Sequence, residues 1–86
     1  MLTSQPAKQI VEALRSCLTV LEKTPGAPRG DAEWLRIRCD DTLLGGDEYW
    51  CKLSLRELEK DVVNFNTEFP GLLAPDLVQA LKTVIC

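Results

Sequence analysis

The amino-acid sequence predicts a small single α+β domain over residues 1–86, with the element order α-β-β-α-α. Apolar residues recur at helical spacing near both ends of the chain, and they alternate with other residues on either side of Gly45-Gly46. Helical spacing predicts helices at the two ends, and the alternation on both sides of a Gly-Gly turn is typical of a β-hairpin. Since a chain of 86 residues buries only a small core, we expect one antiparallel hairpin packed against helices.

The first predicted element is a helix over about residues 5–23. Ile10, Val11 and Leu14 follow the spacing of one helical face, and Pro6 suits a first helical turn. A Pro/Gly loop is expected over residues 24–31, because its two prolines and two glycines cannot continue a helix.

A β-hairpin is predicted over about residues 33–54, with its turn at Gly45-Gly46. On both sides of this turn the apolar side chains have a period of two, which is the period of a strand with one buried face. The parity expected to face the core consists of Leu35, Ile37, Cys39, Tyr49, Cys51, Leu53 and Leu55.

Two more helices are predicted, over about residues 55–66 and 75–85. Ser54 and Glu57 have the spacing of a capping box, which favours a helix start at this point. Pro75 and Asp76 are typical of the first turn of a helix, where proline is tolerated and an acidic side chain faces the positive end of the dipole.

The composition argues against several classes of function. The chain has 10 basic and 13 acidic residues, a net charge of −3 and no histidine. Duplex nucleic-acid binders usually have a basic surface, so nucleic acid is an unlikely partner. Because histidine is the commonest general base, we expect no enzyme and no catalytic residues. Acidic residues flanking the turn could bind a cation or serve an enzyme, but their spacing does not match a calcium loop.

The four cysteines do not form a metal-binding motif, because none of their spacings is Cys-x-x-Cys. We therefore predict no metal and no cofactor. Cys39 and Cys51 are equidistant from Gly45 and would face each other in the hairpin, either as a disulfide or as two reduced thiols in the core.

The chain is expected to be cytoplasmic and not to enter a membrane. No apolar run approaches the ~20 residues of a membrane-spanning helix. Glu12 and Arg15 interrupt the apolar stretch near the N-terminus, so it does not resemble a secretion signal. In the cytoplasm the cysteines would remain reduced.

The outward parity of the predicted hairpin is the candidate site. Tryptophan and arginine are enriched at binding hot spots, so this face predicts a non-enzymatic adaptor, inhibitor or regulatory subunit that binds a protein. In this hypothesis the rings are buried by the partner and the cations pair with its carboxylates. The proposed partner-binding residues are Trp34, Arg36, Arg38, Trp50 and Lys52.

Two alternative interpretations of this face remain open, and two further kinds of association are possible for the domain. Aromatic rings beside cations also suit a nucleotide or single-stranded nucleic acid. Alternatively, a helix or the Pro/Gly loop covers one or both tryptophans, which then form a second minor core. A strand edge could pair with another chain, and open edges with a small core also favour a homodimer.

Overall fold

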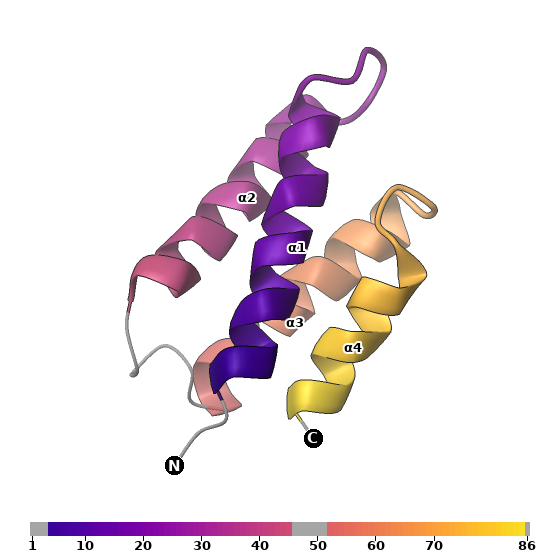
Figure 1. The fold of residues 1–86 in the computed structure, drawn as a ribbon. Coiled ribbons are helices and arrows are strands. Elements are labelled where there is room, and N and C mark those ends of the chain that lie inside the picture. Colours follow the sequence, from indigo (N-terminus) through magenta and orange to yellow (C-terminus); the bar gives the residue numbers. More distant parts are fainter. Residues whose placement is uncertain (1–3, 46–51, 86) are drawn as a thin grey trace.

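The computed structural model describes residues 4–45 and 52–85, with side chains over 7–45 and 55–83. These residues form four helices and contain no strand (Figure 1), so the predicted α+β fold with a β-hairpin is wrong. Helix α2 occupies the place of the first predicted strand. The helices are α1 (Ser4–Glu22), α2 (Arg29–Leu44), α3 (Lys52–Glu68) and α4 (Pro75–Ile85).

Helix α2 forms because its buried residues follow a helical period that extends beyond the alternating stretch. Ala32, Leu35, Cys39 and Thr42 are separated by three, four and three residues, and all four are buried. Leu35 and Cys39 are four residues apart, so they lie on the same face in a strand and also in a helix. The alternation over residues 34–40 fails at Ile37, which was expected to face the core and is 45% exposed.

The second predicted strand is also wrong where the structure describes it. Residues 52–54 belong to the first turn of α3, which begins at Lys52. Ser54 therefore lies inside the helix and not at the helix start that its capping-box spacing predicted. Tyr49, Trp50 and Cys51 lie outside the described residues. Without a strand in the described ranges, pairing through a strand edge loses its basis.

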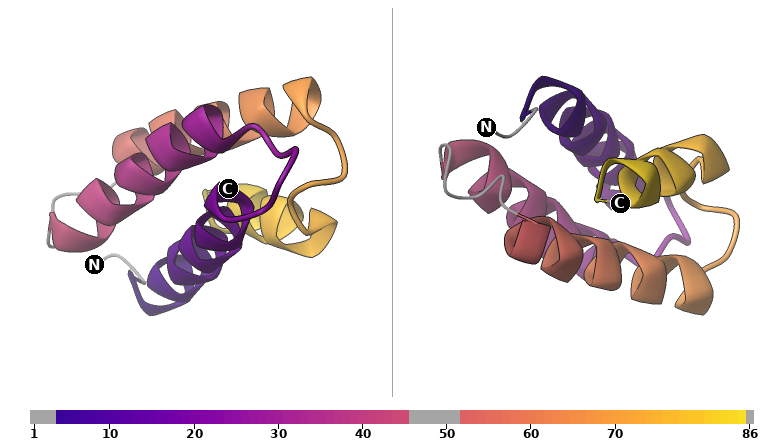
Figure 2. Two further views of the ribbon diagram at one scale, coloured as in Figure 1. Left: turned by 90° about the horizontal axis from the view of Figure 1, so that it is seen from above. Right: turned by 90° about the horizontal axis from the view of Figure 1, so that it is seen from below.

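The helices form two layers, α1 with α4 and α2 with α3 (Figure 2). Helix α1 packs against both α2 and α4, and α3 also packs against both of them, so the four helices enclose one apolar core. The packing is most extensive between α1 and α2 and least extensive between α2 and α3. The fully buried side chains at the centre of the core include Leu14, Leu18, Leu35, Leu58, Val62 and Leu81.

Two glycines allow the chain to reverse between helices. Gly26 has a φ of 84° between α1 and α2, and Gly71 has a φ of 88° between α3 and α4. Backbone in this left-handed region is strained for residues with a Cβ atom. The end of α1 is also closed by Thr24, whose hydroxyl donates to the Val20 carbonyl at 2.7 Å.

A cluster of ion pairs joins α1 to α2. Arg36 donates from Nε to Glu22 Oε2 at 2.6 Å and from Nη1 to Asp40 Oδ2 at 2.7 Å. Arg15 of α1 also pairs with Asp40. The hydrogen bond to Glu22 raises the pKa of Arg36 above its already high usual value, so this side chain remains cationic. The cluster ties the rotation of α2 to α1.

We predict that Arg36→Met destabilises the fold more than Arg29→Met. Methionine retains much of the length of Arg36 but removes the hydrogen-bond donor of Glu22 and one of the two arginines that pair with Asp40. Arg29 is exposed and belongs to none of the ion pairs among the described residues. Urea unfolding followed by circular dichroism should give a lower midpoint for the Arg36 variant. Equal midpoints would show that the cluster does not stabilise the helix pair.

Candidate functional site

The structure places two of the five predicted site residues together. Trp34 and Arg38 are neighbours on α2, where the Arg38 guanidinium lies 5.6 Å from the centre of the Trp34 ring. Arg36 points to α1, as described above. Trp50 lies outside the described residues, and Lys52 begins α3 with its side chain outside them.

An exposed apolar stripe runs along α2 on the side opposite the core. Its members are Trp34, Ile37 and Leu44, with exposed fractions of 54%, 45% and 85%. They are spaced by three and seven residues, so they share one helical face. We call this stripe the outer face. Ile37 and Leu44 were not among the predicted site residues. The predicted strand turned Ile37 toward the core, and Leu44 directly preceded the predicted turn at Gly45-Gly46.

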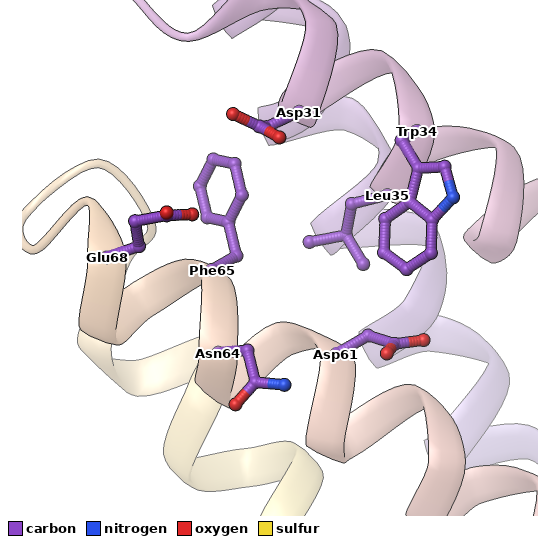
Figure 3. Close-up of a pocket in the computed structure, with 7 residues that line it drawn as sticks. All are labelled: Asp31, Trp34, Leu35, Asp61, Asn64, Phe65 and Glu68. Carbon is purple, nitrogen blue, oxygen red and sulfur yellow. The ribbon is translucent and has the colours of Figure 1, made fainter.

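A small hollow, which we call the α2–α3 groove, opens between α2 and α3 next to Trp34 (Figure 3). Its volume is about 130 Å³. Trp34, Leu35 and Phe65 supply its apolar walls. The polar residues that line it are Asp31, Asp61, Asn64 and Glu68.

Arg38 contacts both the Trp34 ring and helix α3. Its Nε lies 3.2 Å from Asp61 Oδ2, an ion pair that joins α2 to α3. This oxygen is screened from solvent and accepts no hydrogen bond. The guanidinium of Arg38 supplies the positive charge that faces Asp61. The same arginine stacks on the indole, which is a favourable cation–π contact.

The groove has an excess of negative charge. No basic side chain among the described residues lies within ion-pair distance of Asp31 or Glu68. Glu68 ends α3, and the last turn of this helix contains no basic residue. Since the C-terminal end of a helix is the negative end of its dipole, Glu68 adds to the negative charge there. A cation is favoured at this place and an anion is not.

The described residues offer little for nucleophilic or metal chemistry. Within residues 4–45 and 52–85, no three His, Cys, Asp or Glu side chains are grouped to hold a metal ion. Cys17 and Cys39 are free thiols. Burial, with a smaller effect of the Asp40 carboxylate, raises the pKa of Cys39 to about 12, although Arg15 acts in the opposite direction. A protonated thiol is a poor nucleophile.

The proposed pairing of Cys39 with Cys51 loses its geometric basis. It depended on a hairpin, whereas Cys39 lies on the core side of α2 and is fully buried. Cys51 lies outside the described residues.

Comparisons with known proteins assign no relative to this chain: no protein-family model, no curated protein and no solved structure matches it. Within the described part of the chain, no helix combines the length and the apolar character that crossing a membrane requires.

We predict that Cys39 makes the stability of the protein fall at alkaline pH. In the unfolded chain the thiol ionises near its usual pKa of about 8.5, whereas in the folded chain it stays protonated to about pH 12. Stability is therefore complete below pH 8 and is lost as pH rises, by up to roughly 1.4 kcal/mol per pH unit.

The measurement is urea unfolding of the wild type and of Cys39→Ala at pH 8, 10 and 11. The other titrating groups are common to both proteins and cancel in the difference. The wild type should lose more stability than the variant as pH rises. A difference that is constant with pH would contradict the shifted pKa.

Proposed function

We propose that this chain is a non-enzymatic interaction module that binds another protein through the outer face of α2. The observation that carries the proposal is the exposure of Trp34, Ile37 and Leu44 on a helix whose opposite face belongs to the core. The intramolecular packing of α2 does not require these three side chains. They therefore leave apolar surface that a partner can remove from water.

The energetics favour Trp34 as the central contact. Each Å² of apolar surface removed from water contributes roughly 25 cal/mol, and an indole offers more of it than any other side chain. Trp34 already stacks with Arg38, which is held by Asp61. A ring that is oriented before binding loses less conformational entropy when a partner covers it.

The structure changes the roles that the sequence suggested for the two arginines. Arg36 is engaged with Glu22 and Asp40, so it is not included in the proposed contact. Arg38 is assigned to orient Trp34. The carboxylates beside the ring disfavour phosphate groups, so we do not extend the proposal to nucleotides or single-stranded nucleic acids.

We predict that Trp34→Ser combined with Ile37→Ser abolishes partner binding and leaves the fold intact. Both side chains are exposed, so their loss removes little core packing. The matched control combines Val20→Ser with Leu72→Ser, which removes two exposed apolar side chains outside the outer face. Circular dichroism and thermal unfolding verify that both variants remain folded.

The readout is affinity capture from a lysate of the cells that make the protein. We expect a specific partner with the wild type and with the control, and its loss with the outer-face variant. Equal recovery by all three proteins, or no specific partner of the wild type, would reject the proposal. Sedimentation of the purified chain tests self-association. A dimer that the outer-face variant abolishes would make a second copy the partner.

A further inference from the structure

We propose that the α2–α3 groove receives a lysine or arginine side chain of the bound protein. The inference rests on the proposed function, because Trp34 belongs both to the outer face and to the groove. A partner that covers the outer face would therefore bring its own side chains to the mouth of the groove. Three properties of the groove determine which side chain enters it.

The first property is size. The groove has a volume of about 130 Å³. Sites for drug-sized ligands and cofactors are usually about 300–1,000 Å³. The groove thus matches a single side chain better than a cofactor or a nucleotide.

The second property is the nature of the walls. Trp34, Leu35 and Phe65 provide apolar surface for the methylene stem of a long side chain. Figure 3 shows the Trp34 and Phe65 rings on either side of Leu35, with the carboxylates at the edges. Lysine and arginine have such an apolar stem with a charged end, and an indole or phenyl ring also attracts the cation itself.

The third property is charge. Asp31 and Glu68 flank the Phe65 ring and have no described ion-pair partner, whereas Asp61 is paired with Arg38. No basic side chain lines the groove, although Arg38 lies beside it, in contact with Trp34 and 3.2 Å from Asp61. A cationic side chain would compensate this charge. The described carboxylates are not grouped closely enough for a metal ion.

The same charges argue against a second copy of this chain as the occupant. In a symmetric dimer through the outer face, each copy presents the same patch to the other. Each copy would then bring an acidic groove to the interface, in a chain that already has a net charge of −3. A basic partner of different sequence has the complementary charge.

The test uses N-acetylarginine methylamide as the probe and N-acetylcitrulline methylamide as its neutral isostere. Each is titrated into ¹⁵N-labelled protein while the Trp34 indole N–H signal is followed, and Trp34→Phe assigns that signal. A single side chain without a surrounding interface should bind weakly, with a Kd on the order of millimolar. We expect saturable shifts with the arginine probe and at least threefold weaker binding of the citrulline probe.

Two matched variants test the carboxylates. Glu68→Gln removes one negative charge at the groove and should weaken binding of the arginine probe severalfold. Glu12→Gln removes one from the exposed side of α1 and should leave the Kd unchanged. Combining Asp31→Asn with Glu68→Gln should weaken binding further than Glu68→Gln alone.

Equal binding of both probes, no saturation of the arginine probe, or equal effects of Glu68→Gln and Glu12→Gln would overturn the inference. These titrations contain no partner protein, so their failure leaves the capture result on the outer face unchanged. Conversely, a failed capture experiment would not alter the response of Trp34 to the arginine probe. Self-association that Glu68→Gln abolishes would make a second copy the occupant and would also overturn the inference.

Discussion

Burial of Ala32, Leu35 and Cys39 fixes the rotation of α2 about its axis, and the proposed binding surface depends on this rotation. Once these side chains face the core, the geometry of a helix turns Trp34 and Ile37 outward. Arg36 reinforces the same rotation through its hydrogen bonds to Glu22 and Asp40. The outer face is therefore a consequence of how the core is packed.

The groove exists because the four helices pack unequally against one another. Helix α2 packs extensively on α1 and sparsely on α3, so a hollow remains where Asp31 and Leu35 approach Phe65 and Glu68. The Arg38–Asp61 ion pair connects α2 to α3 beside this hollow. Filling the hollow with a larger apolar residue would improve the packing of α2 on α3 but would remove the space that the proposed cationic side chain needs.

The sequence predicted helices wherever the apolar period was long enough to be unambiguous. The expected range 5–23 compares with Ser4–Glu22 in α1, and 75–85 compares with Pro75–Ile85 in α4. The stretch 34–40 was too short to separate a period of two from a helical one, and the small Ala32 and polar Thr42 concealed the longer helical stripe. Trp34 and Arg38 were predicted to share one face of a strand, and a spacing of four residues makes them neighbours on α2 instead. The acidic side of the groove depends on the pairing of α2 with α3, which no local pattern specifies.

The rotation of α2 is tested most directly by broadening of methyl NMR signals with a soluble gadolinium chelate. Val20 and Leu18, which are 63% and 0% exposed, serve as the accessible and inaccessible references. Ile37 should broaden like Val20, while Leu35 should be as protected as Leu18. Equal protection of Ile37 and Leu35 is the pattern of a strand with one buried parity. It would contradict the helical assignment and remove the outer face together with the groove.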